Sequence, residues 1–206
     1  MSTFKRNVIT KHNITARRFA LLAAKDEKIF HIKDLAALWQ IQNANTLRIT
    51  LGRYQKDGLI YRIFKGFYSL VPPDELSPPE LGAKALHSFC YLSTETVLYD
   101  EGFVSQKPSS YTFVSPKSKK FKLVDASYKS RQLKSKYLYN PAGICLKDGI
   151  NIASPERAIA DMLYFNPKAH FDKNPSWDKV KEMQKSLGYP LTKSRYVASS
   201  SIGCST

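Results

Sequence analysis

The sequence predicts an α+β protein of two domains, and three observations support this. Residues 29–71 combine two short helical patterns with two β-rich runs. Prolines then interrupt residues 72–79, where neither a helix nor a strand can continue. From residue 111 onward, apolar and polar residues alternate in short segments that end in turn residues. We therefore expect four segments: domains at 1–72 and 80–196, a proline-rich linker at 73–79, and a disordered tail at 197–206.

The first domain is predicted to begin with a helix at residues 15–27, which has Phe19, Leu22 and Ala23 on its inner side. A short strand is expected at residues 29–32. A second helix follows at about residues 33–40, because Leu35, Leu38 and Trp39 fall at i, i+3 and i+4. Lys33 stands where a serine or threonine would be expected to cap this helix.

A third helix starts after Asn43 or Asn45, either of which can cap it. Its apolar face is formed by Ala44, Leu47, Leu51 and Tyr54. The helix ends before Gly58, which suits the left-handed position after a helix. Two β-rich runs joined by residues 64–66 then predict a hairpin that pairs with the strand at 29–32. This order of elements predicts a winged helix-turn-helix.

The outward face of the third helix, opposite Leu47 and Leu51, has no acidic residue. Asparagine and arginine can make bidentate contacts with adenine and guanine edges, and an exposed isoleucine can contact a thymine methyl group. Gly52 on this face costs about 1 kcal/mol of helix propensity, and close approach to a nucleic-acid backbone is one reason to tolerate it. The other interpretation is an ordinary solvated helix face in a domain that binds protein.

We favour double-stranded DNA as the partner, because the hairpin adds basic residues at its tip. An operator with inverted repeats, bound by a monomer or a DNA-assisted dimer, would fit. The candidate DNA-binding residues lie on the helices and the hairpin: Arg17, Arg18, Gln42, Asn43, Asn45, Thr46, Arg48, Ile49, Arg53, Arg62 and Lys65.

The formal net charge of +15 favours an anionic partner. Residues 1–72 hold 13 Lys and Arg against 4 Asp and Glu, so +9, whereas residues 73–206 hold 19 against 13, so +6. The charge is therefore densest where the helix-turn-helix is predicted. No apolar run reaches the roughly 18 residues that a membrane span needs, and the first residues lack a signal-peptide core. We therefore expect a cytoplasmic protein without a membrane partner.

The second domain is predicted to open with a helix at residues 79–89, with Leu81, Ala85 and Phe89 in line, followed by an extended pair at 91–92. A helix at 94–101 follows, capped by Ser93. Three strands are then expected, within 111–115, 120–125 and 136–140. A hairpin is expected about Asp148 and Gly149. A helix should then begin at Ser154, Pro155 and Glu156 and bury Ile159, Met162 and Leu163. A last helix is expected at 177–186.

Motifs that carry catalysis are missing from the sequence. It has no P-loop, no G-x-S-x-G, no H-E-x-x-H and no paired carboxylates. We interpret Glu156 as a capping acid and Asp161 as a solvated acid on the same helix. The three cysteines are odd in number and far apart, and packing explains His87 and Cys90 better than a shared metal. We therefore expect no enzymatic activity, no cofactor and no metal.

A second basic segment spans residues 107–136, with nine Lys and Arg against Asp125 alone, so +8. Tyr111, Phe113, Tyr128 and Tyr137 interleave with these cations. The segment predicts a second anion-facing surface, although lysines on an edge strand also discourage aggregation. The candidate residues of this surface are Lys117, Lys119, Lys120, Lys122, Arg131 and Lys134.

Four segments in this order resemble the AbiEi family, the antitoxin components of type IV toxin–antitoxin (abortive infection) systems. They are Phe30 with residues 34–36, residues 51–70 (L-x-R-Y-x-K-D-G-L-I-Y-R-I-x-K-G-F-Y-S-L), residues 91–103 (Y-L-S-T-E-T-V-L-Y-D-E-G-F) and residues 153–163 (A-S-P-E-R-A-I-A-D-M-L). The resemblance implies an N-terminal winged helix that represses the protein's own operon. It also implies a C-terminal domain that counteracts a nucleotidyltransferase toxin, with or without direct contact.

Two other functions stay open. The first is a stand-alone transcriptional regulator without a toxin, whose second domain senses a ligand or makes the dimer; a nucleotidyltransferase reading frame just downstream would argue against it. The second is an enzyme that acts on nucleic acid, for which metal-dependent loss of a labelled DNA or RNA substrate would be the sign. The antitoxin is the function that the sequence supports best.

Overall fold

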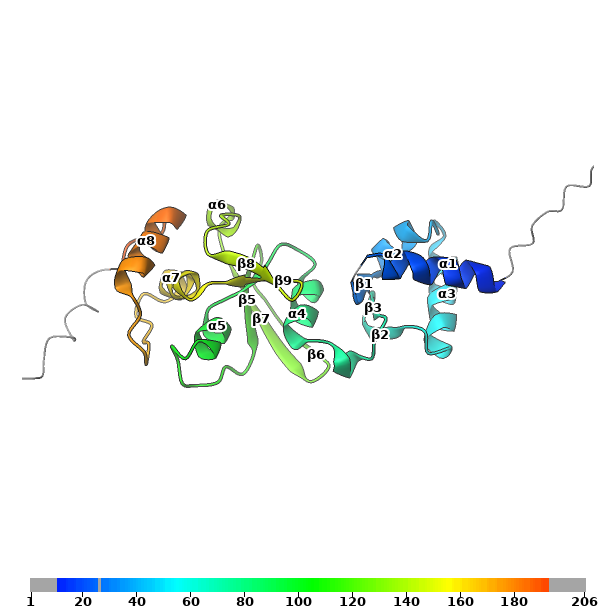
Figure 1. The fold of residues 1–206 in the computed structure, drawn as a ribbon, viewed down its shortest axis with the longest axis horizontal. Helices are drawn as coiled ribbons and strands as arrows, with labels where there is room; N and C mark the ends of the chain where they lie inside the picture. Colours follow the sequence, from blue (N-terminus) through cyan, green and yellow to red (C-terminus); the bar gives the residue numbers. More distant parts are fainter. Residues whose placement is uncertain (1–10, 26, 193–206) are drawn as a thin grey trace, which may run out of the picture. The chain divides into compact units, whose positions relative to one another are not determined.

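The structure, a computed structural model, describes residues 11–25 and 27–192 (Figure 1). The predicted tail at 197–206 lies outside the described residues. The chain divides into two compact units, Met1–Leu76 (unit 1) and Ser77–Thr206 (unit 2). Both units mix helices and strands, so the expectation of an α+β protein is confirmed. In the described part of the chain, no helix has the length and apolar character to cross a membrane.

Unit 1 contains three helices and a small sheet. Its elements in chain order are α1 (Lys11–Ala23), β1 (Ile29–His31), α2 (Ile32–Leu38), α3 (Ala44–Lys56), β2 (Tyr61–Phe64) and β3 (Phe67–Ser69). The sheet order is β1-β3-β2, and both pairings are antiparallel. The short strand expected at 29–32 therefore does pair with the hairpin, as predicted.

One apolar core holds the three helices against this sheet. It consists of the buried side chains of Leu22, Phe30, Leu35, Trp39, Leu47, Leu51, Tyr54 and Ile60. The Tyr54 ring meets the edges of Phe19 and Trp39, with centroid distances of 5.3 and 5.7 Å. α1 begins and ends four residues earlier than predicted, and Ala23 is exposed, not buried. The helical period therefore predicted the packing of α2 and α3 better than the bounds of α1.

Helix caps in unit 1 come from an unexpected residue and an expected one. His31, which precedes α2, accepts a hydrogen bond from the Lys33 backbone N–H at 3.3 Å through Nδ1, and its own N–H donates to Asp34. The cap position of α2 is therefore occupied by His31 and not by Lys33. Its capping box takes the place of a serine or threonine cap. Asn43 caps α3 by accepting from the N–H groups of Asn45 and Thr46. Gly58 has φ +69°, the left-handed position predicted after α3.

The proline-rich segment at 73–79 is structured. Pro73–Glu75 forms a short 3-10 helix (η1), Leu76 is buried, and α4 (Pro78–Leu86) starts at Pro78. A proline suits this first helical position, because the N–H that it lacks would have no partner within the helix. The boundary between the two units, after Leu76, falls inside the segment that the sequence predicts as a linker.

Unit 2 is built on a mixed six-stranded sheet with the order β6-β7-β5-β4-β9-β8. Its strands are β4 (Tyr91–Leu92), β5 (Tyr111–Ser115), β6 (Lys119–Leu123), β7 (Ala126–Gln132), β8 (Ile144–Lys147) and β9 (Ile150–Ala153). Three pairings are antiparallel, and β4 with β9 and β5 with β7 are parallel. The sequence predicts a mainly antiparallel sheet, and antiparallel pairings are the majority, beside two parallel pairings that the sequence does not predict.

Helices cover both faces of this sheet (Figure 1). α4 packs on one face against β4, β5 and β9. α5 (Glu95–Asp100) and α7 (Pro155–Phe165) pack together on the other face, and α8 (Trp177–Leu187) packs on α7. A one-turn helix, α6 (Ser135–Leu138), precedes β8. Unit 2 thus has its own core.

Several local predictions in unit 2 are wrong. The strand expected at 136–140 is mostly α6, which buries Leu138 completely, and the strand that pairs with β6 is β7, at 126–132. Phe89 lies beyond the end of α4 and is 38% exposed, although Leu81 and Ala85 are buried. Ser93 does not cap α5, because its hydroxyl donates to Asp161. For Ser93 and for α6, whose Tyr137 carbonyl accepts from Arg157, a contact distant in sequence prevails over the local pattern.

Unit 1 should fold without unit 2. A fragment that ends at Leu76 keeps the whole core around Tyr54 and the three-stranded sheet. We expect this fragment to show a cooperative thermal transition by circular dichroism. A non-cooperative melt would mean that the two units depend on a shared core.

Candidate nucleic-acid interface

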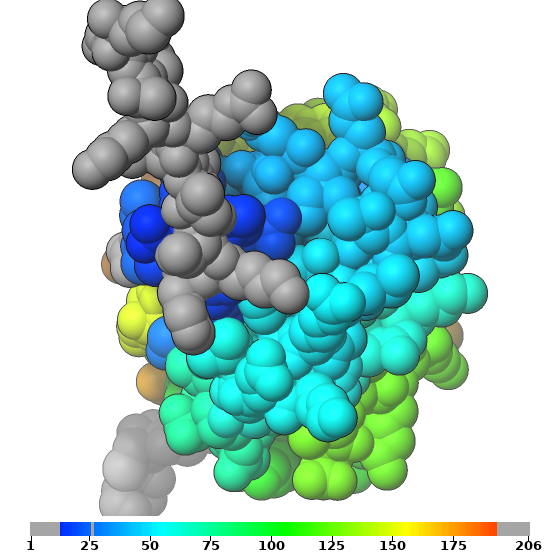
Figure 2. Space-filling view, turned by 90° about the vertical axis from the view of Figure 1, so that its right-hand side faces the viewer, coloured from blue at the N-terminus to red at the C-terminus, as the bar shows by residue number. Residues whose placement is uncertain are grey.

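The outer face of α3, formed by Asn45, Arg48, Ile49, Gly52 and Arg53, is open to solvent in unit 1. All five residues are exposed, and the Ile49 side chain is 57% exposed although it is a large hydrophobic residue. The helix has no acidic residue in its first turn, and Arg53 and Lys56 lie in its last turn. Figure 2 shows the cyan side chains of α3 spread over the surface of the unit. The face combines positive charge, an amide and an apolar group, as the sequence predicts.

Gly52 makes this face flat at one point. Among the described residues, a methyl group placed on its Cα would meet no atom within 4 Å apart from the backbone of its own helix. Packing inside the unit therefore does not require glycine here, and its backbone conformation does not require it either, because its φ is not positive. Close approach by a partner outside the unit remains a physical reason for it.

The β2–β3 hairpin places Arg62 and Lys65 on the surface. The turn passes through Gly66 at φ +84°, and Phe64 and Phe67 stack behind it with ring centroids 4.4 Å apart. The Ile32 N–H donates to the Gly66 carbonyl at 2.7 Å, which fastens the turn to the start of α2. The two cations are thus carried on a hairpin that the sheet and α2 hold in place.

Asn43 and Arg18 have structural partners inside unit 1, of which the sequence predicts only the cap that Asn43 forms. The Asn43 side-chain oxygen is used as the cap of α3. Arg18, a candidate DNA-binding residue, does not face outward. It is half-buried, donates to the Tyr54 hydroxyl at 3.1 Å and lies 5.5 Å from the centre of the Trp39 ring. Arg17, Gln42 and Thr46 are exposed. Arg18 therefore stabilises the core between α1 and α3.

In unit 2, strands β6 and β7 carry a basic face formed by Lys120, Lys122, Lys129 and Arg131. Lys120 is the cross-strand partner of Lys129, and Lys122 that of Ser127. Alternation along the strands puts these four side chains on the face of the sheet that α5 and α7 cover. β6 is an edge strand, and its lysines are exposed. The predicted anion-facing surface therefore corresponds to one face of a sheet edge.

The other residues of the basic segment lie elsewhere. Lys119 points to the opposite face, where its ammonium group is 5.1 Å from the centre of the Phe121 ring. Phe113 and Tyr128 are buried, so these aromatic residues belong to the core and not to the surface. Lys117 and Lys134 are exposed in the turns on either side of the two strands. The aromatic interleaving seen in the sequence is thus a core pattern.

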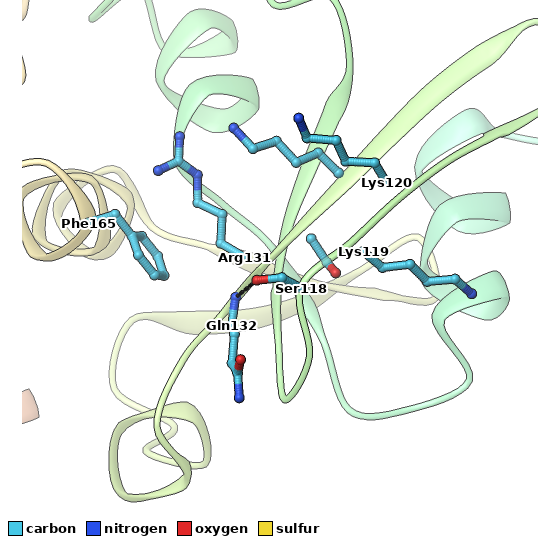
Figure 3. A pocket seen from close by; sticks show the side chains of 8 residues that line it. Ser118, Lys119, Lys120, Arg131, Gln132 and Phe165 are labelled. Atoms are coloured by element: carbon cyan, nitrogen blue, oxygen red, sulfur yellow. Dashed lines mark hydrogen bonds between the residues drawn. The ribbon is translucent and has the colours of Figure 1, made fainter.

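A pocket lies beside this basic face (Figure 3). Arg131 pairs with Glu95 of α5, and its guanidinium lies 5.3 Å from the centre of the Phe165 ring at the end of α7. Lys129 is 3.9 Å from the same carboxylate. Burial alone would raise the pKa of Glu95, but the Thr94 hydroxyl, the backbone and these two cations outweigh it and lower the pKa. Glu95 is therefore ionised at neutral pH and holds Arg131 in place.

A buried polar network in unit 2 was not predicted. Arg157 and Asp161 are both fully buried, so the interpretation of Asp161 as a solvated acid is wrong. Arg157 Nε donates to Asp161 at 3.2 Å, its Nη2 donates to the Tyr91 hydroxyl at 2.7 Å, and Asp161 also accepts from Ser93 and Tyr189. Further donations from Arg157 go to backbone carbonyls of Tyr137, Asn140 and Ala142. The i, i+4 spacing of an arginine and an aspartate in an otherwise apolar helix was the available signal.

Burial sets the electrostatics of this network. Burial raises the pKa of the Tyr91 and Tyr189 hydroxyls, and the Asp161 carboxylate adds to this effect. Burial also raises the pKa of Asp161, against the opposing effect of Arg157. The groups are satisfied by one another and closed to solvent, so we interpret the network as a structural tie between β4, α7 and the segment before β8.

Packing explains one of the two residues considered for a metal, Cys90, but not His87, which is exposed. Cys90 is buried, its thiol points to the Ala83 carbonyl at 3.8 Å, and burial raises its pKa to about 12. His87 ends α4 in a left-handed conformation with φ +48°. Within residues 11–25 and 27–192, no group of three metal-ligating side chains forms.

The sequence matches no protein-family model and no curated protein. Among solved structures, the chain is similar to the crystal structure of the RV2827C protein from Mycobacterium tuberculosis, with 14% sequence identity and a TM-score of 0.47. The alignment covers 84% of this chain and 66% of that protein, so the chain spans just under two thirds of its length. A similarity of this size assigns neither a fold family nor a function to the chain.

Proposed function

We propose that unit 1 is a winged helix-turn-helix that binds duplex DNA, and that the chain is an antitoxin that represses its own toxin–antitoxin operon. The observation that carries the DNA-binding part is the exposed, acid-free outer face of α3, with Asn45, Arg48 and Ile49 on it. An α-helix fits the major groove, where these side-chain types can distinguish base edges. The exposed isoleucine has no function in the core of the unit.

Support for the winged helix comes from the order of the elements. A helix, a strand, two helices and a hairpin follow one another, and the first strand completes the sheet beside the hairpin. In such a domain α3 enters the major groove while the hairpin follows the adjacent backbone. Arg62 and Lys65 would then meet phosphates, which contribute affinity but no sequence information.

Gly52→Ala should separate folding from binding. The added methyl group has open space among the described residues of unit 1, so the helix should gain up to about 1 kcal/mol of stability. Affinity for DNA should fall at the same time, because the methyl group occupies space that we assign to the sugar-phosphate backbone. Thermal melts and gel-shift titrations of the same preparations measure both effects. Unchanged or tighter DNA binding in the stabilised variant would show that no backbone approaches Gly52.

The antitoxin part of the proposal rests on the four sequence segments that resemble the AbiEi family, which lie in both units. In this proposal unit 2 counteracts a nucleotidyltransferase toxin. Its basic face offers a surface for an anionic partner. This partner is either operator DNA, where the face would extend the footprint of the winged helix, or the toxin or the nucleic acid on which the toxin acts. The density of positive charge on this face favours DNA as its partner.

The charge-neutralised variant Lys119, Lys120, Lys122 and Lys134→Gln tests where the basic segment acts. Of these four lysines, Lys120 and Lys122 lie on the basic face, whereas Lys119 points to the opposite face and Lys134 lies in a turn. We expect weaker operator binding, measured by gel shift on DNA from upstream of the protein's own reading frame, and unimpaired rescue of cells that express the neighbouring nucleotidyltransferase. Loss of rescue with intact repression would instead make the surface part of the antitoxin activity. If a folded, soluble variant keeps both activities, the lysines only protect a sheet edge.

The wild-type chain provides the reference in the same two assays. It should bind that upstream DNA more tightly than a scrambled duplex, and it should rescue the toxin-expressing cells. DNA binding without any rescue would favour the stand-alone regulator. Absence of specific binding would contradict the proposal as a whole.

A further inference from the structure

The pocket at the β6–β7 end of unit 2 has a volume of about 450 Å³. This lies within the range of small-molecule sites, roughly 300–1,000 Å³. Its lining combines cations, hydroxyls, an amide and one aromatic ring, and comprises Ser118, Lys119, Lys120, Lys129, Ser130, Arg131, Gln132 and Phe165. Such a lining favours a small anionic ligand.

Two of these cations oppose each other directly. Lys120 and Lys129 are cross-strand partners in the antiparallel β6–β7 pair. Like charges in this position destabilise a sheet. Glu95 offsets this only in part, because it pairs with Arg131 and lies 3.9 Å from Lys129. In the described part of the chain Lys120 has no ion-pair partner, so the pair is left with an excess of positive charge.

The walls around this pair are fixed. Arg131 is held between Glu95 and the Phe165 ring, and in Figure 3 it lies on the same side of the strands as Lys120, whereas Lys119 extends away from it. Ser118 Oγ accepts from the Gln132 N–H at 3.1 Å. Among the residues that the structure describes, the Ser118 hydroxyl donates to no acceptor. One hydroxyl donor therefore remains beside the uncompensated lysines.

We propose that this pocket binds the phosphomonoester group of a small phosphorylated ligand between Lys120 and Lys129, with Ser118 as a further donor. A phosphomonoester carries a charge of about −1.5 to −2 at neutral pH. That charge matches two opposed ammonium groups better than the single charge of a phosphodiester in DNA. Charge-assisted hydrogen bonds of this kind are the strong ones in proteins.

AMP and cyclic AMP form a matched pair of probes, because they share base and sugar but present a phosphomonoester and a phosphodiester. Isothermal titration of the full chain, without DNA and at about 0.15 M salt, should show one binding site for AMP. Inorganic phosphate should compete with AMP for this site, and cyclic AMP should bind at least about tenfold more weakly than AMP. Lys120→Gln/Lys129→Gln should weaken AMP by about tenfold or more. The control Lys147→Gln/Lys179→Gln removes the same charge from exposed positions elsewhere in unit 2 and should bind AMP like the wild type.

Folding of the variant can be checked in the same preparations. Without ligand, Lys120→Gln/Lys129→Gln should melt at or above the wild-type temperature, because the opposed charges are gone. AMP should raise the melting temperature of the wild type and not of this variant.

Four results would overturn the proposal. The first three are no AMP binding, equal affinity for AMP and cyclic AMP, and an equal loss of AMP affinity in the control variant. The fourth is a loss of operator affinity in Lys120→Gln/Lys129→Gln as large as its loss of AMP affinity. The last result would assign the pocket to DNA.

Discussion

Arg157→Met should destabilise unit 2 by about 3–5 kcal/mol, the range found when one partner of a buried ion pair is removed. The substitution leaves the Asp161 carboxylate fully buried without its cation. It also takes the donor away from the carbonyls of Asn140 and Ala142, which precede β8. A buried acceptor without a partner adds about 1–3 kcal/mol of desolvation cost.

Urea unfolding of the full chain, followed by circular dichroism, measures this loss. Glu156→Gln is a control on the same helix. It removes a first-turn carboxylate that has no buried partner within residues 11–25 and 27–192, and we expect a loss within about 1 kcal/mol. Arg157→Met/Asp161→Leu should recover part of the stability, because no charge then stays buried. A loss below about 1 kcal/mol for Arg157→Met alone would mean that water enters the network.

Arg48→Ala and Asn45→Ala should each weaken operator binding by about 1–3 kcal/mol and relax discrimination at one base pair. Both side chains are exposed on the outer face of α3 and are not needed for the core of unit 1. Their loss should therefore leave the thermal stability of the unit nearly unchanged. We therefore expect the two substitutions to lower the affinity for DNA without lowering the stability of unit 1.

Lys65→Ala on the hairpin is the matched comparison. A phosphate contact carries no sequence information, so this variant should weaken all duplexes alike and reduce the salt slope of binding by about one unit. Gel-shift titrations at several salt concentrations distinguish the two classes of residue. Loss of discrimination in Lys65→Ala would place the hairpin, and not α3, against the bases.

The sequence predicted unit 1 well, because its elements are set by local signals. Leu35, Leu47 and Leu51 follow the helical period, and Gly58 and Gly66 take the positive φ angles that their turns require. The bounds of α1 and the cap of α2 were not predicted. His31 is an unusual cap, and its capping bond with Lys33 becomes visible only in three dimensions.

Unit 2 was predicted less well, because contacts distant in sequence decide it. The segment around Tyr137 alternates like a strand, yet Arg157 binds the Tyr137 carbonyl and α6 buries Leu138. Ser93 has the pattern of a helix cap but bonds to Asp161, 68 residues away. In the basic segment the charges were predicted, whereas the pairing of Lys120 with Lys129 depends on the register of β6 and β7.

Competition binding of the wild type and Arg48→Ala to operators that carry every single base-pair change tests the central claim most directly. If α3 reads the major groove, the wild type should discriminate at the position that Arg48 contacts by about 1–3 kcal/mol, and Arg48→Ala should lose that preference while it keeps the others. An identical base-preference profile for the two proteins would contradict the assignment of α3 as the element that reads DNA.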